Sequence, residues 1–203
     1  MDLGRPYADV LTGARGRVIA ALVQASEPMT VRALAALADA SPQGTLDVVE
    51  DLAEAGIVSL ARAGRARMAS LNHEHLAVQP MTEIVELEVR LVQALKKHLC
   101  DWVGLQAAWL FGSAARGDGD LHSDIDLLLV ADDLDLRRWA RQTDDLRDRI
   151  VAWTGNEAQL TEYERASFDR LVRRKNELIT EVRRDGVALT HGLRARRILD
   201  PPR

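Results

Sequence analysis

The chain has 203 residues, with 31 Asp and Glu against 27 Lys and Arg, and a formal net charge of −4. This length suits one large or two small domains, and the balanced charge gives no bulk electrostatic argument for nucleic-acid binding. The single cysteine, Cys100, excludes internal disulfides and cysteine-rich zinc sites, and we expect a buried or half-buried thiol. Without a long apolar run or an apolar signal core, we expect a soluble, cytoplasmic protein with no membrane partner.

Residues 1–78 read as three helices followed by a hairpin. Apolar positions at helical spacing predict helices over 11–25, 31–38 and 45–55, with Ser41 as a helix N-cap and Pro42 at the first helical position. Two short apolar runs, 57–60 and 67–71, flank a turn at Gly64-Arg65. This order resembles a winged helix-turn-helix. A polar connector with two histidines follows, so we place a domain boundary near Val78, which gives domains 1–78 and 79–203.

The third of these helices is unusual for a DNA-reading element. It carries four acidic residues and no basic one: Asp47, Glu50, Asp51 and Glu54. Carboxylates are repelled by the phosphate backbone of DNA. If this helix nevertheless enters a groove, Gln43 and Thr45 at its start can reach base edges. Arginines of the hairpin can also touch a backbone: Arg62, Arg65 and Arg67. DNA binding is therefore weakly supported, and a role in homodimer formation or partner docking stays open.

Residues 79–203 predict alternating helices and strands. We expect helices over 81–99, 134–153 and 166–184, and strands over 105–111, 123–130, 158–163 and 187–190. We expect the segment after 190 to fray. This order favours a small mixed sheet with helices on one face and an open face that bears aspartates. The predicted fold class is α/β (α+β): a winged helix-turn-helix followed by this mixed-sheet domain.

Two neighbouring segments carry the chemistry. The apolar run that ends at Phe111 is followed by Gly112-Ser113, where free backbone N–H groups and a hydroxyl can hold a phosphate. The next apolar run contains Asp124 and Asp126, and i, i+2 spacing in a strand puts both carboxylates on one face, roughly 7 Å apart. Hard oxygen ligands beside a phosphate cradle are what a Mg²⁺-dependent phosphoryl-transfer site requires.

The same residues carry a resemblance to a known family. Gly112-Ser113-x-x-Arg116-Gly117, followed by Ser123-Asp124-Ile125-Asp126, resembles the motif of the minimal nucleotidyltransferases in the DNA polymerase beta superfamily. The resemblance covers about residues 81–192. It implies that Asp124 and Asp126 are catalytic metal ligands, that Gly112 and Ser113 bind the nucleotide, and that ATP or another nucleoside triphosphate binds with two Mg²⁺ ions. Arg116 either contacts phosphate or braces the loop through an ion pair.

The third carboxylate that the family uses is where this sequence departs. Gln159 falls where we place that aspartate, and an amide can neither act as a base nor bind a metal well. Period-2 alternation puts Glu157 on the same face as Gln159, so Glu157 is the best catalytic substitute and Glu162 is the poorer one. The alternative is that both glutamates are solvated surface charges.

The resemblance implies transfer of a nucleoside monophosphate, AMP from ATP, to a hydroxyl acceptor. Relatives of this minimal type act as antitoxins that modify a HEPN-type RNase partner, or they modify small molecules such as aminoglycosides. We prefer a protein acceptor, because the chain is short for the second role. Two alternatives stay open: a DNA-binding regulator whose nucleotidyltransferase domain only senses nucleotide, and a non-catalytic partner-binding module.

Overall fold

A computed structural model describes residues 1–132, 136–174 and 176–200. The chain divides into two compact units, which we treat separately. Unit 1 contains Met1–Gly4 and Glu88–Arg203, and unit 2 contains Arg5–Leu87. The domain boundary near Val78 remains a prediction; Val78 is buried among the core residues of unit 2. None of the helices in the described ranges combines the length and the apolarity that crossing a bilayer requires.

Unit 2 is a winged helix-turn-helix with a three-stranded antiparallel sheet in the order β1-β3-β2. Its elements are η1 Pro6–Asp9, α1 Gly13–Gln24, β1 Met29–Thr30, α2 Val31–Leu37, α3 Pro42–Glu54, β2 Val58–Ala63, β3 Ala66–Leu71 and α4 Val78–Val85. The sequence expectations for the three helices and the hairpin are confirmed, whereas β1 was not foreseen.

Local chemistry explains where these elements begin and turn. The Ser41 side chain accepts a hydrogen bond from the Gly44 N–H and so caps α3, as predicted, and Thr30 caps α2 in the same way through Ala33. The β2–β3 hairpin closes through a two-residue turn whose first residue, Gly64, has a φ of +61°. Such turns need a left-handed residue, which glycine adopts without steric cost.

Unit 1 contains a four-stranded mixed sheet in the order β6-β5-β4-β7. Its elements are α5 Leu87–Leu99, β4 Leu105–Phe111, α6 Gly112–Arg116, β5 Ile125–Ala131, α7 Leu136–Thr154, β6 Ala158–Glu164, α8 Arg165–Arg174, α9 Glu177–Asp185, β7 Val187–Ala188 and α10 Gly192–Leu199. Strands β5 and β6 are parallel, while β4 is antiparallel to both β5 and β7. The predicted mixed sheet is confirmed.

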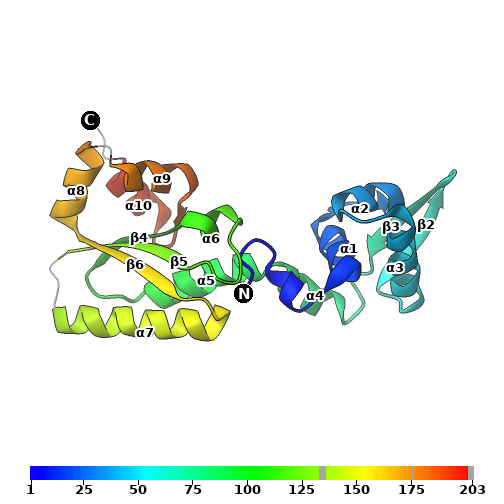
Figure 1. The fold of residues 1–203 in the computed structure, drawn as a ribbon, viewed down its shortest axis with the longest axis horizontal. Coiled ribbons are helices and arrows are strands. Elements are labelled where there is room, and N and C mark those ends of the chain that lie inside the picture. Colours follow the sequence, from blue (N-terminus) through cyan, green and yellow to red (C-terminus); the bar gives the residue numbers. More distant parts are fainter. Residues whose placement is uncertain (133–135, 175, 201–203) are drawn as a thin grey trace. The chain divides into compact units, whose positions relative to one another are not determined.

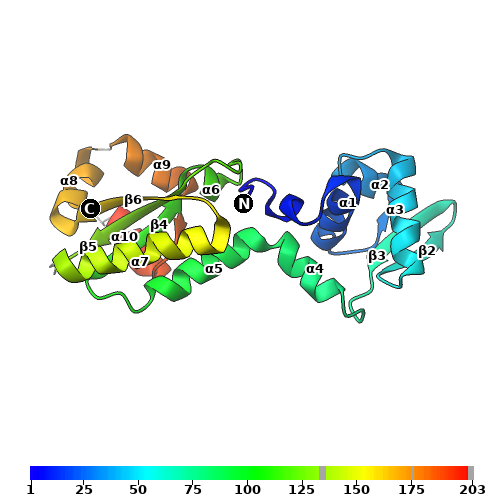
Figure 2. The same ribbon diagram turned by 60° about the horizontal axis from the view of Figure 1, so that its bottom comes forward.

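Helices cover both faces of this sheet, which corrects the expectation of one open face (Figure 1 and Figure 2). One face packs on α5 and α7 through Leu95, Leu146 and Ile150. The other packs on α8, α9 and α10 through residues that include Phe168 and Ile179. Because β5 is buried on both sides, it reads as an almost continuous apolar run. The polar end of this strand, at Asp126, is the part that remains partly exposed.

Four further expectations need correction. The predicted helix 81–99 is split, because the chain leaves helical geometry at Glu86, where it passes from unit 2 to unit 1. The predicted helix 166–184 is also two helices, since Asn176 caps a new one. The segment after 190 forms α10, because Ala195, Ile198 and Leu199 are buried on the sheet. Cys100 is exposed, one residue beyond the end of α5. Leu134, where we expected a helix to begin, lies outside the described residues.

Candidate functional site

The turn after β4 brings the chain against the acidic strand. Gly112 has a φ of +70°, and a Cβ atom at this position would lie 2.2 Å from Oδ2 of Asp126. Strand register explains this proximity, since Phe111 pairs with Asp126 across β4 and β5. Glycine is therefore required twice here, for its backbone conformation and for its lack of a side chain. Ser113 follows directly in the short helix α6, so the predicted turn and the predicted carboxylate meet.

The two aspartates differ in how they are held. Asp126 is the second residue of β5 and is partly buried, while Asp124 precedes the strand and is exposed. Burial raises the pKa of the Asp126 carboxyl above its ordinary value, the negative charges of Asp124 and Glu181 raise it further, and Arg116 opposes the shift. Because the ionised form of Asp126 is disfavoured in this site, a cation that binds there stabilises the carboxylate.

The donor set suits magnesium only when a substrate completes it. In the described ranges, no group of three or more His, Cys, Asp or Glu side chains is arranged to hold a metal ion. Mg²⁺ is commonly bound by one or two carboxylates together with substrate phosphates and water. Asp124 and Asp126 therefore fit a metal that arrives with a nucleoside triphosphate. The metal would supply charge neutralisation at the phosphates.

Gln159 lies beside Asp126 on the neighbouring parallel strand. Directly paired residues project to the same face of a sheet, so the position next to Asp126 carries an exposed amide instead of a carboxylate. Glu157 precedes β6, and its carbonyl accepts a hydrogen bond from the N–H of Ile125. The Glu157 side chain is exposed, and its assignment as the third acid stays a prediction.

Glu162 is engaged elsewhere. It accepts a hydrogen bond from Nε1 of Trp139 and lies 3.3 Å from Arg147. Both partners belong to α7, on the face where Ala158 and Leu160 pack. The structure therefore places Glu162 on the face opposite Gln159, as the alternation predicts.

Arg116 is held by carboxylates from its own loop and from α9. Its guanidinium lies 3.1 Å from Asp118, 3.3 Å from Glu181 and 3.9 Å from Asp185. The hydrogen bond to Asp118 and these charges raise the pKa of Arg116 further above its ordinary value. Of the two roles foreseen for Arg116, the ion-paired one is present here, and a phosphate contact stays a prediction.

Sequence reasoning missed two contributors to this region. Glu181 lies on a charged helical segment far from Arg116 in the sequence, and its proximity to Arg116 depends on how α9 packs on the sheet. Asn156 follows the glycine at the end of α7, and it is buried and hydrogen-bonded to the segment that precedes Asp124. From the sequence alone, an asparagine directly after a helix-ending glycine looks the same whether it only ends the helix or also holds a distant segment by hydrogen bonds.

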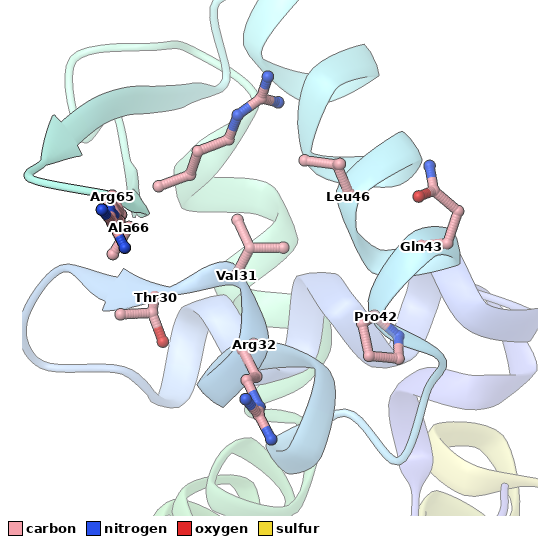
Figure 3. Close-up of a pocket in the computed structure, with 9 residues that line it drawn as sticks. Thr30, Val31, Arg32, Pro42, Gln43, Leu46, Arg65 and Ala66 are labelled. Atoms are coloured by element: carbon pink, nitrogen blue, oxygen red, sulfur yellow. The ribbon is translucent and has the colours of Figure 1, made fainter.

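The acidic residues of α3 in unit 2 are partly neutralised. Asp47 accepts a hydrogen bond from Gln43, Glu50 pairs with Arg67, and Asp51 lies 3.2 Å from Arg15. Thr45 is fully buried, so the expectation that it reaches bases is wrong. A pocket of about 480 Å³ lies between the β2–β3 hairpin, which is the wing, and the starts of α2 and α3. Figure 3 shows Arg65 and Ala66 of the wing on one side and Pro42, Gln43 and Leu46 of α3 on the other.

Comparison with protein families gives a match for the part of the chain that contains the Gly112 turn and the two aspartates. Residues 90–185 match the family model described as Polymerase beta, Nucleotidyltransferase. These residues form a nucleotidyltransferase domain. The domain includes the Gly112-Ser113 turn, both aspartates and the ion pairs of Arg116, so the suspected family is confirmed for this part of the chain. No curated protein matches the chain in sequence.

Solved structures show weaker likenesses. The MarR family transcriptional regulator SPO1453 from Silicibacter pomeroyi DSS-3 is 24% identical, with 41% of this chain and 62% of that chain covered and a TM-score of 0.33. A structure described as a toxin-antitoxin with AMP-PNP is 22% identical, with 55% and 80% covered and a TM-score of 0.36. A mutant of the toxin-antitoxin MntA-HpeT is 20% identical, with the same coverage and TM-score. The chain thus spans less than two thirds of the first of these proteins.

Proposed function

We propose that the nucleotidyltransferase domain transfers AMP from ATP to a hydroxyl group on a partner protein, in the manner of an antitoxin that modifies a HEPN-type RNase. The observation that carries this proposal is the close approach of the Gly112 turn to the Asp126 carboxylate, since a Cβ at Gly112 would lie 2.2 Å from its Oδ2. The exposure of Asp124, Glu157 and Gln159 supports a large acceptor, because an open site admits a side chain of a folded protein.

Each residue has a distinct part in this proposal. Ser113 and the backbone N–H groups of the Gly112 turn hold phosphate oxygens of ATP. Asp124 and Asp126 hold Mg²⁺, which neutralises the triphosphate. The acceptor oxygen forms a bond to the α-phosphorus, the bond between that phosphorus and the bridging oxygen breaks, and pyrophosphate leaves. The acceptor proton passes to Glu157, because the amide of Gln159 cannot take it.

The proposal is tested by incubating the protein with ATP labelled at the α-phosphate, Mg²⁺ and a cell lysate. Label is expected on a protein band that appears only when this protein is added, and that band is expected to be absent when ATP carries the label at the γ-phosphate. Asp124→Ala combined with Asp126→Ala should abolish the transfer. Asp144→Ala is the matched control, because Asp144 is an exposed carboxylate on α7 whose ion pair is with Arg147 of the same helix. Transfer that survives loss of both aspartates would contradict the proposal.

DNA binding by unit 2 is a second candidate, favoured by one specific observation. Arg32, Arg65 and Arg67 line the same pocket as the exposed Gln43, at the start of α3. Guanidinium groups at this place can contact phosphates even though the body of α3 is acidic. Retardation of a labelled duplex from the upstream region of the gene tests it, with a salt titration to count phosphate contacts.

A further inference from the structure

The position of Asp124 is not fixed by the sheet. Strand β5 begins one residue later, and the first pairs of its two ladders are Ile125 with Ala158 and Asp126 with Phe111. The Asp124 side chain is exposed, so packing does not fix it either. A metal ligand must nevertheless be held within a narrow range of positions. On the side of the strand, the peptide that follows Asp124 is held by the hydrogen bond from the Ile125 N–H to the Glu157 carbonyl. On the other side, groups outside the ladder hold the backbone that leads into Asp124.

The buried amide of Asn156 occupies that place. Asn156 lies between α7 and β6 and is 3% exposed. Its Nδ2 donates to the carbonyl of Ser123 at 3.0 Å and to the carbonyl of Leu121 at 3.4 Å. Its Oδ1 accepts from the terminal ammonium of Met1 at 2.8 Å, and its own N–H donates to Thr154 Oγ1. Ser123 is the residue directly before Asp124.

The segment that Asn156 holds is also tied together within itself. Asp120 accepts hydrogen bonds from the His122 N–H and the Ser123 hydroxyl, and the Asp120 N–H donates to Ser123 Oγ. At its other end, the Asp118 N–H donates to the carbonyl of Ser113. The segment 118–123 is thus a compact loop that is held at Asp118 by the Ser113 carbonyl, at Gly119 by the Gly4 N–H, and at its Asp124 end by Asn156.

We propose that Asn156 is a positioning residue that fixes Asp124 for metal binding through the Ser123 and Leu121 carbonyls. This inference rests on the proposed function, because it assumes that Asp124 binds a metal together with a nucleotide. Asparagine meets the requirement because it offers two N–H donors to the two carbonyls and one acceptor on the opposite side. Aspartate has the same shape but donates nothing when ionised, so it leaves both carbonyls without this donor.

The test compares two binding measurements on the full chain. Binding of Mn²⁺ in the presence of ATP is followed by electron paramagnetic resonance, and binding of ATP with a chelator is followed by calorimetry. Loss of a residue that orients a metal ligand typically weakens metal binding about 10–100-fold. We expect a loss of that size in Asn156→Asp, with metal-free ATP affinity unchanged, because the Ser113 turn is intact. Amide hydrogen exchange at 121–125 should become faster.

Asn72→Asp is the matched control, since the Asn72 amide donates to the carbonyl of Gly56 and its oxygen accepts from Glu74 in unit 2. It should leave both measurements unchanged. Asn156→Ser keeps one donor without adding charge, and it replaces Asn156→Asp if that variant does not fold. Wild-type Mn²⁺ affinity retained in the Asn156 variant would overturn the positioning role, as would an equal loss of metal-free ATP binding. A wild-type protein without metal-dependent nucleotide binding would instead refute the proposed function, and the inference with it.

Discussion

Gln159 pairs with Asp126 across the parallel ladder between β5 and β6. The residue beside Asp126, the partly buried candidate metal ligand, is therefore neutral, where the family resemblance implies an acid. This pairing predicts that the site binds a metal–nucleotide complex more readily than it activates an acceptor hydroxyl. It also identifies Gln159→Asp as the substitution that restores the third carboxylate of the family's pattern.

Gln159→Asp is expected to increase the rate of AMP transfer by at least about tenfold, because a well-placed general base contributes on the order of 10²–10⁴ in rate. The measurement is incorporation of α-labelled phosphate into the protein acceptor. Thr161→Asp is the control, since Thr161 lies one pleat further along β6 and pairs with Leu128. A Gln159→Asp rate no higher than wild type would contradict this prediction and show that a carboxylate at position 159 adds nothing to the base that Glu157 supplies.

Gly112→Ala is expected to displace the Asp126 carboxylate. The left-handed backbone alone costs a non-glycine residue about 1–2 kcal/mol, and the new Cβ would also lie 2.2 Å from Asp126 Oδ2. Chemical unfolding and ATP titration measure the two effects. Gly13→Ala is the control, because Gly13 has a φ of +66° with no atom within 4 Å of an added Cβ. If the two variants lose equal stability, Gly112 and Asp126 are not in the contact described.

Asp126→Asn is expected to stabilise the metal-free protein near neutral pH. Burial raises the pKa of Asp126 in the folded state above its ordinary value of 3.8, so the folded protein binds this proton more tightly than the unfolded chain. The contribution of Asp126 to stability therefore falls as pH rises from about 3.8 through the raised pKa. The gain in Asp126→Asn should be below about 1 kcal/mol, since solvent screens a partly exposed group, and it should vanish in acid.

Thermal unfolding of Asp126→Asn and wild type across this pH range checks the sign. Added Mg²⁺ with ATP should stabilise wild type and have a smaller effect on the variant. A variant that is less stable than wild type at neutral pH would contradict the assigned direction.

His98 is expected to contribute to loss of stability in weak acid. Burial lowers its pKa below the ordinary 6.5, and the nearby Asp145 carboxylate opposes this shift. Nε2 lies 3.5 Å from Asp145 Oδ2 without forming a hydrogen bond, and the ring packs edge-on against Trp102 and Trp153. Because the unfolded chain binds this proton more tightly, stability is lost as pH falls from about 6.5 through the lowered pKa.

The measurement is a proton NMR titration of His98 in wild type and in Asp145→Asn. The variant should show a lower pKa and a steeper loss of stability below pH about 6.5. An unchanged or higher pKa would show that the Asp145 charge does not reach the ring.

Arg32→Ala and Arg65→Ala test the DNA-binding candidate. If these side chains contact phosphates, each variant should weaken binding to all duplexes alike and reduce the slope of log affinity against log salt by about 1. Arg149→Ala is the control, because it removes the same charge from α7 in unit 1, where Arg149 pairs with Asp145. Equal binding by all three variants would favour a protein-docking role for unit 2.

Local sequence signals predicted most of the elements. Strand β4 was predicted with its observed bounds, because its apolar run ends at a glycine that turns the chain. The start of α3 followed from Ser41 and Pro42. The predicted phosphate turn also lies beside Asp126, since a strand pairing between β4 and β5 brings two short-range motifs together.

What the sequence did not predict depends on contacts between distant segments. The second layer of helices was missed because the pattern of helix 166–184 does not say which face of the sheet it covers. The short α10 was expected to fray, and its burial requires the sheet face provided by Trp109 and Val130. The role of Asn156 was missed because its partners, Leu121 and Ser123, lie more than thirty residues earlier. The burial of Thr45 was likewise invisible, since its position in the helix resembles that of a base-contacting residue.

The most direct test of the central claim is calorimetric titration of the wild-type protein with ATP, with and without Mg²⁺. If Ser113, Asp124 and Asp126 converge on a magnesium-bound triphosphate, ATP should bind more tightly with Mg²⁺, and Asp124→Asn combined with Asp126→Asn should remove that gain. Equal ATP affinity with and without Mg²⁺ in the wild-type protein would contradict it.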